Sequence, residues 1–308
     1  MSALFTSALA ASAEAASGQH YPQGTLYVVA TPIGNLADIS LRALYVLGLV
    51  DAIACEDTRH TQSLLRAYGI DKSTSQLIAL HQHNEAQAAH TVIDHLRQGR
   101  RVAYVSDAGT PGISDPGARL VAALQQENFR CIPLPGPSSV TTVLSAAGLA
   151  QDQAGGFVFS GFLPSKSGER DRAVQALAAE TRAVVLLEAP HRIEALALAL
   201  ASLDNRMVTV GRELTKQFEE IATVAAIALP AWLAADTNRL RGEFALVLHP
   251  LAPAPEVAQD TRVLRLLLEQ LPLKTAVKLA ADITGEPRNA LYQIALTLKA
   301  GESGHASS

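Results

Sequence analysis

The side chains and backbone best suited to chemistry lie in residues 102–117, VAYVSDAGTPGISDPG. A short apolar, β-branched run ends at Val105 and predicts a buried strand. Glycine or proline occupies five of the nine positions 109–117, so the chain must turn sharply beyond that strand. Such a loop lets bare backbone approach a ligand closely. Asp107, which precedes it, suits ligand hydroxyl groups or a positive charge.

The same loop differs from the common phosphate-binding loops. It lacks the lysine and the spacing of a P-loop, and it does not match G-x-G-x-x-G. A tight structural turn is the alternative interpretation, but the density of glycine and proline beside Asp107 favours a ligand loop. Residues 114–116, Ser-Asp-Pro, are typical of a helix start and predict a helix over residues 118–126.

Alternating strand-like and helical patterns begin at Thr25 and predict the elements that position this loop. This alternation predicts a mostly parallel, right-handed sheet covered on both faces, whose ligands bind beyond the carboxyl ends of the strands. Polar residues, glycine and proline gather at those ends. The expected strands are residues 25–30, 51–56, 76–81, 101–105 and 130–134, and the expected helices are residues 40–49, 61–68, 85–98, 119–126 and 138–147.

Two further units follow. Strand-like runs predict a second α/β domain, and after a proline-containing linker three short helical patterns predict a helix-turn-helix-like domain. The second-domain strands are expected at residues 157–161, 183–188, 207–211 and 244–249. The predicted organisation is a disordered extension (1–22), an N-terminal α/β domain (23–150), a C-terminal α/β domain (151–250), a helical domain (257–300) and a disordered tail (301–308).

Composition narrows the class of protein. The 308 residues are 48% hydrophobic and 18% charged, which is typical of an ordered globular chain. A net charge of −4 offers no overall attraction for nucleic acid, so such a partner must meet local basic patches. Cys55 and Cys131 lie in apolar runs, which indicates buried thiols in a reducing compartment. No run predicts a membrane span, and the first twenty residues lack the pattern of a secretory signal, so we expect a cytoplasmic protein.

Seven segments together closely resemble the RsmI-type ribosomal RNA small-subunit 2′-O-ribose methyltransferases of the tetrapyrrole-methylase superfamily. They are VVATPIGNLADIS, ACEDTRHTQSLL, VAYVSDAGTPGISDPG, PLPGPSSV, FVFSGFLP, LLEAPHRI and VGRELTKQFEE, in collinear order within residues 24–300. The resemblance implies two α/β domains with S-adenosylmethionine in the cleft between them, plus a C-terminal helix-turn-helix domain. It implies methylation of a cytidine ribose in the decoding region of 16S rRNA, within the small ribosomal subunit. Because superfamily relatives often dimerise, we expect a homodimer.

The resemblance also assigns cofactor residues. Many tetrapyrrole methylases carry Gly-Asp where this chain has Ala108 and Gly109, so any acidic role must shift to Asp107. The residues assigned to S-adenosylmethionine are Pro32, Ile33, Gly34, Asp107, Ala108, Gly109, Thr110, Pro111, Ser138, Ser139, Glu188 and Arg212.

A ribose hydroxyl is a poor nucleophile, so a base near it would help methyl transfer. Glu56, Asp57 and Glu213 are acids at strand ends, and Lys216 could lower the pKa of the hydroxyl electrostatically. Asp57 is equally well placed to cap the helix that follows it. Basic residues at the same strand ends are expected to contact RNA phosphates, namely Arg59, Lys166, Arg170 and Arg192.

Two alternatives concern metal and substrate. His81, His83 and Glu85 make a weak metal motif, and Asn84 capping the next helix is the favoured interpretation, so no metal is predicted. A small-molecule, tetrapyrrole-like methylase on the same scaffold is the alternative activity, and a catalytically silent RNA-binding module is a third. The basic strand ends and the C-terminal unit favour an RNA substrate, and the dense cofactor-type loops favour an enzyme.

Overall fold

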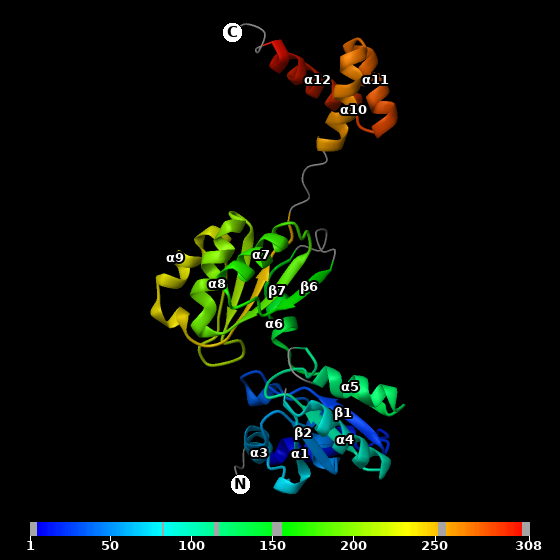
Figure 1. Cartoon of the computed structure of the whole chain (residues 1–308), viewed down its shortest axis with the longest axis vertical. Helices are drawn as coiled ribbons and strands as arrows, with labels where there is room; N and C mark the ends of the chain where they lie inside the picture. Colours follow the sequence, from blue (N-terminus) through cyan, green and yellow to red (C-terminus); the bar gives the residue numbers. More distant parts are fainter. Residues whose placement is uncertain (1–4, 82, 114–116, 150–155, 252–256, 304–308) are drawn as a thin grey trace. The chain divides into compact units, whose positions relative to one another are not determined.

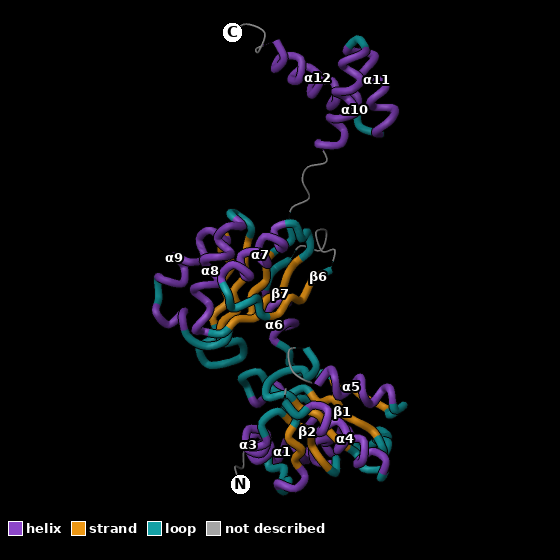
Figure 2. The backbone as a smooth tube through the Cα atoms, in the orientation of Figure 1, coloured by secondary structure: helices purple, strands orange, loops and turns teal. Residues whose placement is uncertain are grey.

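The computed structural model describes residues 5–81, 83–113, 117–149, 156–251 and 257–303. The chain forms two compact units, Met1–Pro250 and Leu251–Ser308. The first unit contains two five-stranded sheets with helices packed against them, and the second contains helices (Figures 1 and 2).

The first sheet is parallel throughout, as the alternating pattern predicts. Its strands lie in the order β3-β2-β4-β1-β5, with each neighbouring pair parallel. The strands are β1 (Thr25–Val29), β2 (Ala52–Cys55), β3 (Leu77–Ala79), β4 (Val102–Val105) and β5 (Arg130–Leu134). The helices of this part are α2 (Leu41–Leu49), α3 (Thr58–Ala67), α4 (Glu85–Arg97), α5 (Gly117–Gln126) and α6 (Ser139–Ala146).

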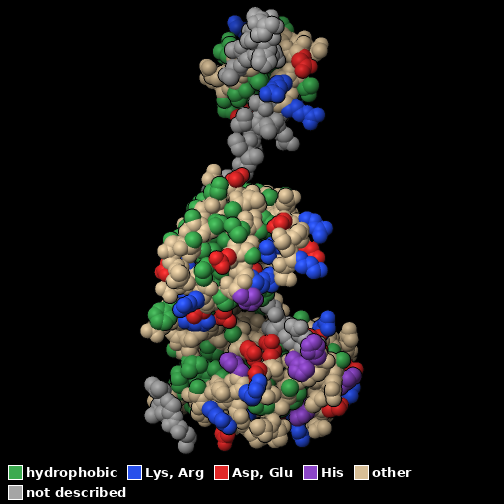
Figure 3. Space-filling model, turned by 60° about the vertical axis from the view of Figure 1, so that its left-hand side comes forward, with side chains coloured by type: hydrophobic (Ala, Val, Ile, Leu, Met, Phe, Trp, Pro, Cys, Tyr) green, Lys and Arg blue, Asp and Glu red, His purple; other side chains and the backbone are tan. Residues whose placement is uncertain are grey.

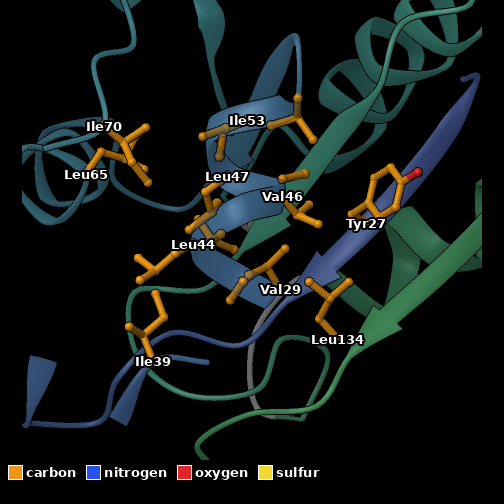
Figure 4. Packing of buried hydrophobic residues seen from close by; sticks show 14 of the residues in the cluster. Tyr27, Val29, Ile39, Leu44, Val46, Leu47, Ile53, Leu65, Ile70 and Leu134 are labelled. Atoms are coloured by element: carbon orange, nitrogen blue, oxygen red, sulfur yellow. The ribbon is translucent and has the colours of Figure 1, made fainter. Parts of the chain in front are cut away.

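Both faces of this sheet are covered, because all residues of β2 and β4 are buried. Successive side chains of a strand point to opposite faces. Tyr27 and Ile53 therefore pack against α2 and α3, in the cluster that Figure 4 shows. Leu26 and Tyr104 pack on the other face against α4 and α5. The carboxyl ends of the strands, and the loops that follow them, are thus held by a core on each side.

Residues 6–16 form helix α1 (Thr6–Ala16), in place of the disorder expected for the whole extension. Alanine is the best helix former, and the tract is rich in it. Phe5 and Leu9 pack against the core beside α2, and the Phe5 ring meets the buried Tyr68 edge-on at 5.0 Å between centroids. The alanine and serine content signals low hydrophobicity, but a few apolar residues are enough to dock the helix.

The second sheet is mixed and has one strand that the sequence pattern did not predict. Its order is β6-β7-β10-β8-β9; β6 and β7 pair in parallel and the other three pairs are antiparallel. The unpredicted strand β9 is an edge strand with no fully buried residue, so it lacks the apolar run of a central strand. The strands are β6 (Phe157–Gly161), β7 (Ala183–Glu188), β8 (Met207–Arg212), β9 (Glu220–Ala225) and β10 (Phe244–Leu248).

Helices from both halves of the first unit cover this second sheet. On one face lie α7 (Ser167–Ala178), α8 (Ile193–Leu200) and α9 (Leu229–Ala234). On the other face lies α6, whose Val140 and Val143 pack against the inward side chains of β7 and β10. The helix that follows the last strand of the first sheet is therefore part of the core of the second sheet.

The second unit contains three helices close to the expected positions: α10 (Val257–Gln270), α11 (Leu273–Thr284) and α12 (Arg288–Ser303). They enclose a small core that includes Leu264, Val277 and Leu291. Gly285 ends α11 with φ of 79°, the left-handed cap that glycine favours. Helix α12 includes residues 301–303 of the expected tail, while residues 304–308 lie outside the described residues.

The start of α5 offers a stability test. Residues 114–116, whose capping role was predicted, lie outside the described residues, but Gly117 is buried. A Cβ added there would overlap the ring of Tyr104, which is fully buried. We expect Gly117→Ala to lower the free energy of unfolding by about 1–3 kcal/mol, through overpacking.

The matched control is Gly48→Ala in helix α2, where an added Cβ meets no atom within 4 Å. This variant should be unchanged or about 1 kcal/mol more stable, because alanine is the better helix residue. Urea unfolding of both variants measures the difference. Equal urea midpoints of unfolding for the two variants would show that the Tyr104 ring can move aside with no loss of stability.

Candidate active site

Two adjoining cavities lie where the loops after the first sheet meet the second sheet. The first has a volume of about 340 Å³ and the second about 220 Å³. They share Ala108, Ser139 and Leu187 as lining residues. The first is further lined by Ile33, Phe162, Glu188, Ala189, Pro190, Leu214, Lys216, Glu243, Phe244 and Ala245, and the second by Glu56, Ser106, Asp107, Gly109, Thr110, Ile113, Ser138 and Val140.

The loop after β1 and the loop after β4 are tied to each other at the second cavity. The Thr31 N–H donates to the Gly109 carbonyl at 2.9 Å, and the Gly109 N–H donates to the Thr31 carbonyl at 3.0 Å. Gly109 has φ of 86°, and an added Cβ would lie 3.2 Å from Cγ2 of Ile33. Glycine is thus required here by backbone conformation and by the approach of the neighbouring loop, beyond the contact with a ligand that the sequence suggested.

The amino end of α6 borders both cavities. Ser138 is the N-cap residue but its hydroxyl makes no capping hydrogen bond, and it lines the second cavity together with Ser139. The Thr110 hydroxyl donates to the Pro137 carbonyl at 2.8 Å and holds the loop after β4 against this helix start. Helix N-termini favour anionic groups, so a carboxylate would be stabilised at this end.

The acids of the first half have distinct positions. Glu56 and Asp107 line the second cavity, where the Asp107 N–H donates to Glu56 Oε1 at 3.2 Å. Asp57 lines neither cavity; its carboxylate caps α3 by accepting from the Arg59 N–H at 2.8 Å and the His60 N–H at 3.4 Å. The hydrogen bond from the Arg59 N–H, followed by those from the Arg59 side chain and the His60 N–H, lowers the pKa of Asp57. The structure therefore gives Asp57 the capping role.

Glu188 lines the first cavity, and one of its carboxylate oxygens is available to accept a hydrogen bond. Only 2% of this residue is exposed. Its Oε1 accepts from the Ala189 N–H at 2.9 Å and lies 3.0 Å from Arg192 Nε. Its Oε2 is buried and has no hydrogen-bond partner among the described residues. A buried carboxylate oxygen without a donor is costly, so this atom is suited to a donor group of a ligand.

Lys216 enters the first cavity from a tightly bent loop. Its Nζ donates to Glu213 Oε1 at 2.7 Å and to Glu243 Oε2 at 2.9 Å. Burial alone lowers the pKa of Lys216, but the hydrogen bonds to Glu213 and Glu243 outweigh it and raise the pKa. Burial alone raises the pKa of Glu213, whereas the Lys216 ammonium and the Glu243 N–H bring it below its usual value. Lys216 is therefore a fixed cation and Glu213 its anionic partner.

The same loop depends on a glycine of the first half. A Cβ added to Gly34 would overlap the Lys216 stem and lie 2.9 Å from the Thr215 hydroxyl. Of the residues assigned to the cofactor, Pro32, Gly34, Pro111 and Arg212 line neither cavity, and the other eight do. Gly34 thus acts by letting the Lys216 stem cross the loop after β1.

Three arginines of the predicted site, Arg170, Arg192 and Arg212, donate to main-chain carbonyl groups. Arg212 is 7% exposed and donates to the Phe218 and Arg241 carbonyls at 3.0 and 3.3 Å. Arg170 is 9% exposed and donates to the Ser165 carbonyl, while Arg192 donates to the Leu163 carbonyl and pairs with Glu188. Main-chain acceptors thus hold the guanidinium groups of both Arg170 and Arg192, which were expected to contact RNA.

Arg59 and Lys166 remain as exposed cations from the predicted RNA contacts, with 92% and 80% of their side chains exposed. On the face in Figure 3, basic and acidic side chains lie interspersed.

The His81 and His83 rings lie 6.1 Å apart, and the described residues contain no cluster of three or more potential metal ligands. Among those same residues, no helix is long and apolar enough to cross a membrane.

Two cavity residues, Glu243 and Phe244, carried no recognisable sequence signal, because they lie at the start of β10 in a stretch that resembles an ordinary strand end. Leu214 belongs to the motif VGRELTKQFEE. Phe162 and Leu187 belong to motifs FVFSGFLP and LLEAPHRI, so the resemblance could have indicated them. The other residues that line the first cavity are brought there by the packing of the two sheets.

Comparison with known proteins defines the class of protein to which this site belongs. The family model described as Tetrapyrrole (Corrin/Porphyrin) Methylases matches residues 25–228, and the chain belongs to this family of S-adenosylmethionine-dependent methylases. A second model, the RsmI C-terminal HTH domain, matches residues 254–299. Within the family, the chain groups with the proteins called ribosomal RNA small subunit methyltransferase I.

The similarity to those proteins extends over nearly their whole length. The chain is 48% identical over 278 residues to ribosomal RNA small subunit methyltransferase I of Escherichia coli O157:H7, covering 89% of this chain and 95% of that protein. The chain is also 47% identical to the Pseudomonas aeruginosa protein of the same name, over 89% of this chain and 97% of that protein. Both domains of the first unit and the helical unit are therefore shared with these relatives.

Solved structures support the fold alone. Cobalt precorrin-4 methyltransferase, a cobalamin biosynthetic enzyme, superposes with a TM-score of 0.55 at 17% identity, over 75% of this chain and 98% of its own. Diphthine synthase superposes with a TM-score of 0.55 at 14% identity, over 73% of this chain and 90% of its own. The two-sheet arrangement expected from the resemblance is confirmed.

The loop after β4 can be tested by substitution at Gly109. We expect Gly109→Val to weaken S-adenosylmethionine binding at least tenfold, since a β-branched residue at φ of 86° must shift both loops of the second cavity. Far-UV circular dichroism should stay near wild type, because Gly109 lies outside the helices and strands.

The control for this experiment is Gly156→Val, which has a similar φ of 85° and no atom within 4 Å of an added Cβ. Gly156 lines neither cavity, so calorimetric titration should give wild-type affinity. Wild-type affinity of Gly109→Val for S-adenosylmethionine would show that the loop after β4 is not part of the cofactor site.

The Lys216–Glu213 pair predicts a pH-dependent stability. Glu213 has a lowered pKa, so its contribution is present above its usual 4.5 and disappears as pH falls through the lower folded value. Lys216 has a raised pKa, so its contribution is present below 10.5 and disappears as pH rises through the higher folded value. We expect Lys216→Gln to cost about 1 kcal/mol at neutral pH and much less at an acid pH below the folded pKa of Glu213.

Denaturant unfolding at the two pH values measures this difference. Lys166→Gln is the control, because its ion pair with Glu169 is exposed and should contribute little at either pH. A Lys216→Gln deficit that is the same at both pH values would mean that the loss comes from packing of the lysine stem.

Proposed function

We propose that this protein transfers a methyl group from S-adenosylmethionine to the 2′-hydroxyl of a cytidine in the decoding region of 16S rRNA, within the small ribosomal subunit. The observation that carries the proposal is the 48% identity to ribosomal RNA small subunit methyltransferase I over 95% of that protein. The match of residues 254–299 to the C-terminal domain of the same group supports it. The tetrapyrrole-like alternative has support from the shared fold alone.

The residues of the two cavities fit the cofactor. The apolar walls of the first cavity, which include Leu187, Leu214 and Phe244, suit an adenine ring, and Glu188 Oε2 can accept from a ribose hydroxyl. The uncapped start of α6 suits the methionine carboxylate, and Asp107 suits the cationic part. When bound, S-adenosylmethionine supplies an electrophilic methyl group on a sulfonium.

Two of the four predicted catalytic residues line the cavities, Glu56 and Lys216. We assign Glu56 to accept the proton of the ribose hydroxyl and Lys216 to stabilise the negative charge that develops there. Glu213 positions Lys216 through the 2.7 Å hydrogen bond, and Asp57 shapes the start of α3. In-line displacement depends on the alignment of the methyl donor with the acceptor hydroxyl, and loops held by hydrogen bonds favour this alignment.

Contacts with RNA are assigned to exposed cations. Arg59 and Lys166 are the exposed members of the predicted set in the first unit. The helical unit adds exposed basic residues and is assigned to grip the substrate: Arg262, Arg265, Lys274, Lys278 and Arg288. A ribosomal substrate places the enzyme in the cytoplasm, and a homodimer remains our prediction.

Transfer of a labelled methyl group to small ribosomal subunits tests this function, followed by mapping of the modified ribose. Subunits from cells that lack the enzyme should gain one label at a cytidine 2′-oxygen. A label that appears on a porphyrinoid and never on rRNA would favour the small-molecule alternative.

The net charge of −4 predicts a preference for assembled subunits over bare RNA. With few exposed cations near the site, binding needs phosphates held in a fixed arrangement, and unfolded RNA must first lose conformational entropy. We expect initial rates on intact subunits to exceed those on stripped 16S rRNA at least tenfold at matched salt. Equal rates would show that a local RNA element is sufficient.

Removal of the exposed cations should weaken that binding. Arg59→Gln and Lys166→Gln should each lower the rate and reduce its salt dependence. The control is Arg97→Gln, an exposed arginine at the end of α4 that lines none of the cavities. Its rate and salt dependence should match those of wild type.

A further inference from the structure

A third cavity, of about 450 Å³, lies in the second α/β domain and shares no lining residue with the first two. Its wall includes Arg212 and Glu213 at the end of β8, and Asp236, Asn238 and Arg241 from the segment before β10. Phe218 also lines it. The residues assigned to the cofactor and to methyl transfer, apart from Arg212 and Glu213, lie elsewhere.

Phe218 is the most exposed large apolar side chain among the described residues, at 69%. A phenylalanine left in water forgoes the favourable burial of its ring. Its loop is nevertheless well held: the Thr215 N–H donates to Glu219 Oε2 at 2.6 Å, and the Glu219 N–H to the Lys216 carbonyl at 3.1 Å. Arg212 fixes the Phe218 carbonyl itself at 3.0 Å. The ring is therefore displayed from a rigid loop.

The other residues that line this cavity are polar, apart from Gly242, and hydrogen bonds hold part of their backbone. Arg212 holds the Arg241 carbonyl at 3.3 Å, and Asp236 Oδ1 accepts from the Asn238 N–H at 2.9 Å. Gly242 has φ of 87°, and an added Cβ would overlap Glu213. Arg241 and Asn238 are both exposed. The cavity thus combines a fixed aromatic face with a guanidinium and an amide.

We propose that the third cavity binds a single unpaired RNA nucleotide next to the methylated one, with its base stacked on Phe218 and its phosphate at Arg241. Recognition of single-stranded RNA uses aromatic stacking with nearby cationic and amide groups. Phe218 is two residues from Lys216, which reaches the first cavity, so one loop links the two positions. The inference rests on the proposed rRNA substrate.

The experiment compares Phe218→Leu, which keeps an apolar side chain but loses the stacking face, with Phe218→Trp, which keeps it. Binding to small subunits and methyl-transfer rates are measured in parallel. Phe218→Leu and Arg241→Gln should weaken subunit binding and raise KM about tenfold, with kcat and S-adenosylmethionine affinity unchanged. Phe218→Trp should behave as wild type. The control, Phe157→Leu, alters another exposed phenylalanine, 48% exposed at the start of β6.

The outcomes separate this inference from the proposed function. Wild-type protein that transfers no methyl to rRNA overturns the proposed function, while the binding measurements still decide the stacking site. Phe218→Leu that binds subunits like wild type overturns the stacking site, and so does a Phe218→Trp variant as defective as Phe218→Leu. A change of sedimentation mass in Phe218→Leu would assign Phe218 to contact between copies of the chain, and would overturn the proposal too.

Discussion

The packing of α6 on the second sheet is the interaction on which the rest of this structure depends. Val140, Val143 and Ala147 of that helix share a core with Val185 and Val247. The helix directly follows the last strand of the first sheet, so one apolar contact fixes the loops of that sheet against the second. The amino end of α6 borders both central cavities as a result.

Around that contact, hydrogen bonds fix the polar groups of the loops within each half. The loops after β1 and β4 are joined through Thr31 and Gly109, and Lys216 crosses Gly34 to reach its carboxylate partner. Preorganisation of this kind suits a displacement reaction, whose rate depends on alignment more than on covalent chemistry by the protein. Glu188 Oε2, which has no hydrogen-bond partner among the described residues, and the uncapped helix start leave acceptor and donor sites for a ligand.

The arginines show where local sequence fails as a guide. Arg170 and Arg212 lie in the same polar segments as Lys166 and Lys216, and Arg192 lies in a third such segment. The exposed Arg59 is also an arginine near a strand end, so residue type does not separate it from them. In the structure these three hold carbonyl groups of neighbouring loops, whereas Arg59 and Lys166 extend into solvent. A guanidinium has five donors and satisfies several loop carbonyls at once, so long-range packing decides which arginines become internal.

By itself, the sequence determined the parallel first sheet, the three C-terminal helices and most of the cavity loops, because apolar periodicity and glycine density are local properties. The resemblance to the methylase family added the cofactor positions Asp107–Thr110 and Ser138–Ser139, which line the second cavity. Tertiary structure alone decided the edge strand β9, the docking of α1 and the cluster of Lys216 with Glu243. Each of these depends on residues distant in the chain, whose approach is set by the burial of shared apolar surface.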